Sequence, residues 1–134
     1  MIDRLAQSGI GIQITQGLRT WEEQDALYAK GRTAHPRGDD HIVTNARGGH
    51  SYHNFGLAVD IVVLDASGAA NWDTDHPGWT AAAKAGKSLG LEWGGDWMGF
   101  KDIPHYQYTN HLPLERCRTL YASGGLPAVW EQVR

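Results

Sequence analysis

A single carboxylate interrupts an apolar stretch of the chain, GLAVDIVVL at residues 56–64. As a strand, this run has one face of bulky side chains, which we expect to be core, and an opposite face stripped of bulk. A charge in such a strand needs a compensating group, and small neighbours leave room for one. The first face comprises Leu57, Val59 and Ile61, and the second comprises Gly56, Ala58 and Asp60.

The surrounding sequence predicts an α+β fold. The isoleucines within residues 10–14 alternate with small or polar residues, as in a half-buried strand. Thr20 and Glu23 form a capping box, which predicts a helix that runs to Lys30. A second helix is expected at 79–90, where it ends at a glycine.

The remaining segments complete a small, mainly antiparallel sheet flanked by helices. Residues 31–50 are predicted to form a long polar loop with room for one short strand at 41–44. A turn is expected at 65–78, a strand ending near 105–108, and one or two short helices in the last stretch of the chain. The length of 134 residues suits one domain, so residues 1–134 are expected to fold as a single unit with a cleft.

Composition excludes several classes of partner. The net charge is −3 and there is no basic run, which argues against nucleic acid or an anionic membrane. No apolar run approaches the roughly 18 residues of a membrane span. Cys117 is the single cysteine, so no disulfide framework or cysteine metal site is expected, and its place on a helical face predicts a buried core thiol.

Two histidines lie in patterns that suit metal chemistry. His53 lies in S-x-H-x-x-G-x-A-x-D, which runs from Ser51 to Asp60, and His105 lies in D-x-P-H, which begins at Asp102. Two imidazoles and one carboxylate make a set of three ligands that leaves a fourth tetrahedral position open, as in a catalytic zinc site. A second carboxylate, Asp102, could then act as a general base.

These motifs resemble those of a known enzyme family. SYHNFGLAVD and WGGDW…FKDIPHYQ, preceded by GLRTWEEQDALYAKGRT, are similar to the zinc-dependent peptidoglycan peptidases of the D-Ala-D-Ala carboxypeptidase and L-alanyl-D-glutamate endopeptidase group, several of which are bacteriophage endolysins. The resemblance extends from about residue 12 to residue 105. It implies a single zinc peptidase domain in which the expected cleft holds zinc.

The resemblance also implies roles for individual residues. His53, Asp60 and His105 match the zinc ligands, and Asp102 matches the catalytic base. Arg19 matches a residue that steadies the substrate carbonyl and its oxyanion. Ser51 matches a serine expected to support the ligands by hydrogen bonding.

The implied function is zinc-assisted amide hydrolysis in the stem peptide of peptidoglycan, at the L-Ala–D-Glu bond. Two alternatives stay open: a D-alanyl-D-alanine carboxypeptidase or dipeptidase on the same scaffold, and a non-catalytic zinc-folded module that binds the cell wall. Asp102 argues against the second, since a purely structural zinc site needs no base. We expect a monomer that neither binds nucleic acid nor inserts into a membrane.

The N-terminal sequence lacks the charged-then-apolar layout of a secretory signal. We therefore expect synthesis in a cytoplasm, and release to the cell wall by another agent such as a phage holin.

Two residues of the sequence depart from the family pattern. The carboxylate before the last histidine is Asp102 rather than Glu, which favours the endopeptidase branch. Tyr106 stands where Phe is commoner, a change expected to be harmless. A leading helix typical of the family is expected to be short or absent, because the chain begins shortly before its first strand.

Other candidate residues have simpler explanations. His50 is expected to be solvated or to support a ligand. Loop or turn carboxylates are expected at Asp39, Asp40, Asp65, Asp73 and Asp75, and core or cleft-wall aromatics at Trp93, Trp97 and Phe100.

Overall fold

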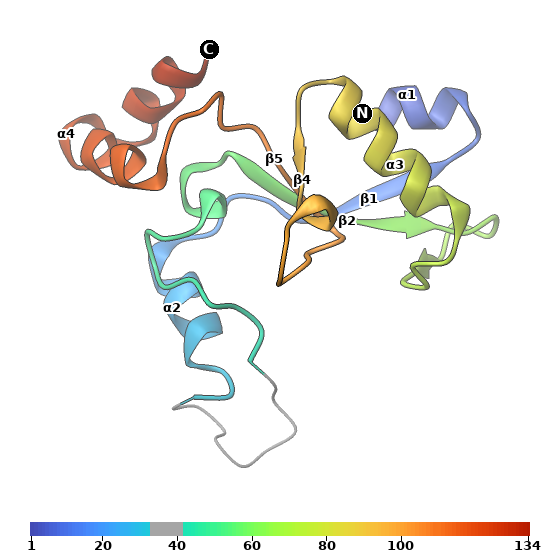
Figure 1. Cartoon of the computed structure of the whole chain (residues 1–134), viewed down its shortest axis with the longest axis horizontal. Coiled ribbons are helices and arrows are strands. Elements are labelled where there is room, and N and C mark those ends of the chain that lie inside the picture. Colours follow the sequence, from blue (N-terminus) through green and yellow to red (C-terminus); the bar gives the residue numbers. More distant parts are fainter. Residues whose placement is uncertain (33–41) are drawn as a thin grey trace. The chain divides into compact units, whose positions relative to one another are not determined.

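The computed structural model describes residues 1–32 and 42–134 (Figure 1). They form two compact units, which we call the sheet unit (Met1–Gly17 and Ala58–Tyr108) and the helical unit (Leu18–Leu57 and Thr109–Arg134). The elements of the sheet unit are α1 (Ile2–Gln7), β1 (Gly11–Gln16), β2 (Ala58–Leu64), β3 (Ala70–Asn71), α3 (Pro77–Ser88), β4 (Glu92–Trp93), η2 (Gly94–Asp96) and β5 (His105–Gln107). Those of the helical unit are α2 (Trp21–Ala29), η1 (Tyr52–Phe55) and α4 (Leu114–Val133).

An antiparallel sheet organises the sheet unit. Its strand order is β1-β2-β5-β4, and β3 pairs with the end of β2. The central strand β2 therefore has a partner on each side, and its register pairs Ile61 with Ile14 of β1 and Asp60 with His105 of β5. This pairing brings two distant sequence motifs onto neighbouring strands.

Helices α1 and α3 pack against each other and against this sheet (Figure 1). The core beneath them is built from strand and helix side chains that exclude water almost completely. Its largest members include Ile61, Val62, Val63, Trp79 and Tyr106.

The helical unit has its own apolar core, in which Phe55 and Cys117 are fully buried. The indole N–H of Trp130 donates to the carbonyl oxygen of Phe55 at 2.8 Å and ties α4 to η1. Within α4, Gly125 adopts a left-handed φ of 69°, so two helices meet there at a kink. The expectations of a core thiol and of one or two short C-terminal helices are confirmed.

Most predicted elements are present, with shifted ends. The capping box of Thr20 and Glu23 forms, and α2 ends at Ala29. α3 begins two residues before the predicted start because Nδ1 of His76 caps it by accepting from the N–H of Gly78 at 3.0 Å. The leading helix α1 is short, as expected. Strand β3 lies inside the predicted turn.

Two details of the sequence prediction differ from the structure. β2 begins at Ala58, so Leu57 lies before the strand and packs in the core of the helical unit. Residues 42–44 form no strand, and the remainder of the 41–44 prediction falls on His41, outside the described residues. Among the described residues, no helix combines the length and apolar character needed to cross a membrane.

Candidate metal centre

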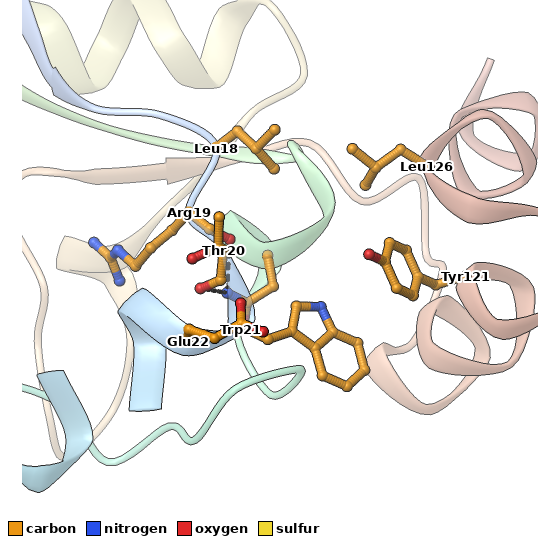
Figure 2. Close-up of a pocket in the computed structure, with 8 residues that line it drawn as sticks. Leu18, Arg19, Thr20, Trp21, Glu22, Tyr121 and Leu126 are labelled. Atoms are coloured by element: carbon orange, nitrogen blue, oxygen red, sulfur yellow. Dashed lines mark hydrogen bonds between the residues drawn. The ribbon is translucent and has the colours of Figure 1, made fainter. Parts of the chain in front are cut away.

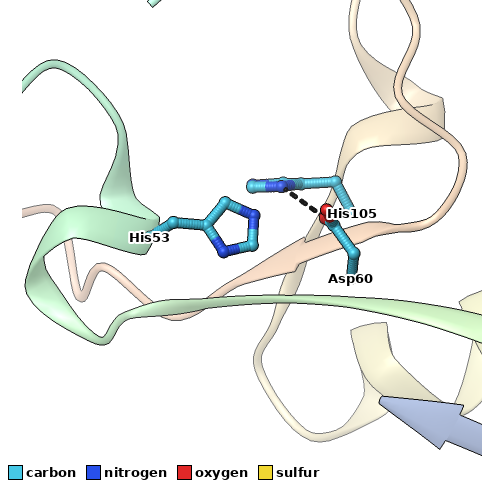
Figure 3. Close-up of side chains that lie close together, drawn as sticks. All are labelled: His53, Asp60 and His105. Atoms are coloured by element: carbon cyan, nitrogen blue, oxygen red, sulfur yellow. Dashed lines mark hydrogen bonds and ion pairs between the residues drawn. The ribbon is translucent and has the colours of Figure 1, made fainter. Parts of the chain in front are cut away.

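The β2–β5 pairing places Asp60 and His105 side by side. Because they are register partners on antiparallel strands, their side chains emerge on the same face of the sheet. Nδ1 of His105 lies 3.2 Å from Oδ1 of Asp60 (Figure 3). Nε2 of His105 lies 2.8 Å from Oε1 of Gln107, which is two residues further along the strand and so on the same face. Both imidazole nitrogens therefore face oxygen acceptors.

The charge around His105 is negative. Burial acts to lower the pKa of His105, but the hydrogen bonds with Asp60 and Gln107 and the charges of Asp60 and Asp102 raise that pKa above its ordinary value. Surroundings that favour an imidazolium favour a cation in general at this position. The electrostatics therefore suit a metal ion.

Asp102 approaches the same histidine from the loop before β5. Its Oδ2 lies 3.8 Å from Nδ1 of His105, and its side chain is 36% exposed, so water has access to it. Backbone bonds fix the loop: the N–H of Asp102 donates to the oxygen of Gly94 at 3.0 Å, and the N–H of His105 donates to the oxygen of Asp102 at 3.1 Å. A β-carbon at position 94 would collide with the carbonyl of Asp102, so this approach requires glycine.

Two tryptophans lie next to His105 and the loop that carries Asp102. The ring of Trp97 lies 5.1 Å from the ring of His105, and Trp93 packs against the core of the sheet unit. The indole N–H of Trp93 donates to the oxygen of Ile103 at 2.8 Å. The prediction of a core aromatic is confirmed for Trp93, and Trp97 is half-buried beside His105. Phe100 is 63% exposed, so its assignment to core or cleft wall is wrong.

His53 is held by the short helix η1. The hydroxyl of Ser51 caps this helix by accepting from the N–H of His53 at 3.3 Å. Asn54 is buried, and its Oδ1 accepts from the N–H groups of Gly49 and Ser51 at 3.0 and 3.2 Å. The backbone that carries His53 is thus fixed from two sides.

Gly56 forms the turn at the end of η1 and is not part of β2. It ends η1 with a left-handed φ of 69°, and a β-carbon there would lie 3.3 Å from the ring of Trp130. The prediction that Gly56 lies beside Asp60 on the strand is therefore wrong. Ala58 does lie on β2, where it is buried.

The three predicted ligands come together. One ligand atom from each of His53, Asp60 and His105 lies within 4.8 Å of the other two (Figure 3). Ligand atoms around a tetrahedral zinc with bonds of about 2.0–2.1 Å are themselves roughly 3.3 Å apart. Two imidazole nitrogens and a carboxylate oxygen within 4.8 Å of one another form a candidate site for one metal ion.

Arg19 lies directly before helix α2. Its backbone N–H donates to the oxygen of His53 at 3.0 Å, and its Nη1 donates to Oε1 of Gln24 at 2.8 Å. Figure 2 shows its guanidinium extending away from Trp21 and Tyr121, which line a pocket of about 370 Å³ in the helical unit. The guanidinium is therefore not directed into the aromatic side of that pocket.

Other histidines and carboxylates have structural roles. His50 is exposed beside Arg118, with Nδ1 and Nη1 3.4 Å apart. Asp65 accepts hydrogen bonds within its own loop, and these lower its pKa. The side chain of Asp73 accepts from the N–H of Asp75 in a turn. His35, Asp39, Asp40 and His41 lie outside the described residues.

Known proteins share similarity with the segment that holds the site. The family model described as D-alanyl-D-alanine carboxypeptidase matches residues 44–108, the segment that holds the three clustered side chains and Asp102. The chain is 45% identical over 109 residues to the peptidoglycan L-alanyl-D-glutamate endopeptidase CwlK of Bacillus subtilis (strain 168), a match that covers 76% of the chain and 63% of that protein. The chain is thus similar to M15 peptidases over the segment that holds these side chains.

Two further proteins named as L-alanyl-D-glutamate peptidases are similar to the chain. The L-alanyl-D-glutamate peptidase of Listeria phage A118 is 36% identical over 110 residues, which cover 81% of the chain and 34% of the phage protein. The crystal structure of the L-Ala D-Glu endopeptidase ChiX of Serratia marcescens aligns with a TM-score of 0.53 and 28% identity, over 81% of this chain and 76% of that one. The chain thus spans under two thirds of the length of both curated relatives.

Among the described residues, three buried carboxamides are absent from the sequence prediction: Gln24, Asn54 and Gln107. Gln107 contacts His105, and the other two contact Arg19. A single amide side chain forms no sequence motif, unlike the spacing of His53 and Asp60. For Gln24, the sequence offered one clue: it lies one helical turn after the capping residue Thr20.

Proposed function

We propose that the chain is a zinc-dependent peptidase that hydrolyses the L-Ala–D-Glu bond in the stem peptide of peptidoglycan, with residues 1–134 acting as one catalytic domain. The observation that carries this proposal is the cluster of His53, Asp60 and His105. The names of CwlK and the phage relative support the choice of bond. Its site of action is the bacterial cell wall, and it works as a monomer.

In this proposal, His53, Asp60 and His105 hold the metal. When bound, zinc supplies a Lewis acid that polarises a carbonyl and lowers the pKa of water toward roughly 7. Asp60 contributes the negative charge of the ligand set, and Gln107 holds the ring of His105 in place. Ser51 acts through the backbone, because its hydroxyl fixes the N–H of the ligand His53.

Asp102 is the general base. Its carboxylate accepts a proton from the attacking water and then passes it to the nitrogen of the leaving amine as the amide C–N bond breaks. Its partial exposure and its place 3.8 Å from His105 support this role. Arg19 donates hydrogen bonds from its guanidinium to the scissile carbonyl oxygen and to the oxyanion that forms from it.

A second candidate is a D-alanyl-D-alanine carboxypeptidase. The description of the matching family model favours it, and the same residues could perform that reaction. A non-catalytic binding module is less favoured, because Asp102 stands beside the ligand set without being needed to close it.

The deciding experiment is mass spectrometry of purified peptidoglycan after incubation with the zinc-loaded chain. We expect new carboxyl termini at L-Ala and new amino termini at D-Glu. Release of D-Ala would instead identify the carboxypeptidase. Binding to the wall without any new terminus would identify the module.

A further inference from the structure

Gln24 is a fully buried polar side chain that contacts Arg19. Its exposed fraction is 0%, and its Oε1 accepts from Nη1 of Arg19 at 2.8 Å. Its Nε2 donates to the oxygen of Ala46 at 2.8 Å and lies 3.4 Å from Oγ1 of Thr44. A guanidinium only donates and a carbonyl only accepts, so these contacts fix the orientation of the amide. Burial of an amide is costly unless it is satisfied in this way.

The start of α2 sets the distance between the two side chains. Thr20 is the N-cap, so Arg19 immediately precedes the helix and Gln24 lies one turn inside it. In many helices this pair of positions holds two apolar side chains that fix the entry of the chain. Here the pair is polar, and the hydrogen bond fixes a guanidinium instead.

The backbone of Arg19 is also held on both sides. Its N–H donates to the oxygen of His53 at 3.0 Å, and its own oxygen accepts from Nδ2 of Asn54 at 3.0 Å. With the main chain fixed, the direction of the guanidinium depends on contacts along the side chain. Gln24 is one such contact, at the charged end.

We propose that Gln24 is a positioning residue, which directs the guanidinium of Arg19 without neutralising its charge. The inference rests on the proposed function, in which Arg19 donates to the scissile carbonyl. A carboxylate at position 24 would hold the guanidinium in an ion pair. The neutral amide holds the guanidinium by a hydrogen bond of 2.8 Å and adds no negative charge beside it.

A double-mutant cycle tests the proposal. The zinc-loaded parent, Gln24→Met, Arg19→Ala and the double variant are compared on a soluble stem peptide that contains the L-Ala–D-Glu bond. We expect Gln24→Met to lower kcat/KM by roughly 10-fold or more, mainly through kcat. In the Arg19→Ala background, the same change should alter kcat/KM by less than about 2-fold, because its target is gone. Gln13→Met makes the same substitution at an exposed position of β1 and should leave activity and Tm unchanged.

A second variant guards against a folding defect in Gln24→Met. Gln24→Glu keeps an acceptor for Arg19 but adds a charge, so we expect a lower kcat with zinc content and Tm close to those of the parent. Equal losses from Gln24→Met in both backgrounds would overturn the proposal in favour of a general structural role. Parent-like activity of Gln24→Glu would overturn the claim about charge.

The same measurements distinguish a failure of the proposed function from a failure of this inference. If the parent cleaves no peptide at all, the assignment as a peptidase is wrong. If the parent cleaves but Arg19→Ala is fully active, the peptidase stands and Gln24 has no catalytic group to position.

Discussion

At the scale of single residues, two carboxylates near His105 have different surroundings. Asp60 lies on β2, where it contacts His105 at 3.2 Å and is mostly enclosed. Asp102 lies on a loop, is more exposed and is 0.6 Å further from the same nitrogen, at 3.8 Å. A ligand benefits from a rigid strand, whereas a base needs access to water and to the leaving group. This difference supports the proposed roles of Asp60 as a metal ligand and Asp102 as the general base.

Asparagine substitutions separate the roles of the two carboxylates. We expect Asp102→Asn to keep zinc and the fold, because the shape is nearly unchanged, while turnover falls by roughly 10²-fold or more. Asp60→Asn removes an anionic ligand and should lose zinc. Zinc content and murein hydrolysis are measured side by side. The opposite pattern would show that base and ligand have been exchanged.

Tyr106 carries a cost that the sequence prediction did not anticipate. Its ring is fully buried, and its hydroxyl finds no hydrogen-bond partner among the described residues. Burial also raises the pKa of this hydroxyl. An unsatisfied buried hydroxyl costs about 1–3 kcal/mol, so the change from the commoner Phe affects stability rather than chemistry.

We therefore expect Tyr106→Phe to raise the free energy of unfolding by about 1 kcal/mol. Urea denaturation of the two proteins measures this difference, with hydrolysis as a check that the site is unaffected. A destabilised Tyr106→Phe would mean that a bound water satisfies the hydroxyl.

At the scale of elements, glycines in the motif WGGDW shape the approach to the site. Gly94 lies against the carbonyl of Asp102, and its own oxygen accepts from the N–H of Asp102 at 3.0 Å. The loop that carries the proposed base is therefore fixed to η2 by a contact between two backbones. Any side chain at position 94 must push that loop away.

Gly94→Ala is expected to destabilise the fold by roughly 1–3 kcal/mol and to lower hydrolysis as well, because Asp102 moves. Gly17→Ala is a suitable control, since a β-carbon there meets nothing within 4 Å and its φ is not in the left-handed region. Thermal unfolding and murein hydrolysis are measured for both variants. Equal behaviour of the two would show that the loop yields without cost.

Short-range sequence patterns predicted the helices and strands correctly where a local interaction determines the element. The alternation of residues 10–14 and the capping box of Thr20 are short-range signals, and both elements form. The errors arise where neighbours in space decide. β3 exists because it pairs with the end of β2, and the Gly56 turn is set by η1 and Trp130. Neither partner is visible from the local sequence.

At the scale of the whole molecule, strand order brings Asp60 and His105 together. Asp60 and His105 are 45 positions apart in sequence, yet the pairing of β2 with β5 makes them direct neighbours. Motif spacing and the family resemblance together predicted these two residues as candidate ligands. Spacing could not give the sheet order, the register or the buried amides Gln24 and Gln107, because these depend on contacts between distant segments.

A metal bound by His53, Asp60 and His105 links three separate stretches of the chain, so zinc binding should stabilise the folded state as a whole. Zinc at 100 times its Kd is expected to add about 2.7 kcal/mol to the free energy of unfolding, which corresponds to a rise in Tm on the order of 5–10 °C. Calorimetry of the chain with zinc and after chelation measures the shift, and chelation should also abolish hydrolysis.

Variants show whether the proposed ligands are responsible for that shift. His53→Ala and His105→Ala should lose both the rise in Tm and the activity, because each removes one of three ligands. Asp102→Asn should keep the rise while losing activity. His50→Ala, at an exposed histidine outside the ligand set, should keep both. A rise in Tm that persists in His53→Ala and His105→Ala would place the metal elsewhere in the chain, and full activity of the metal-free parent would exclude a zinc mechanism.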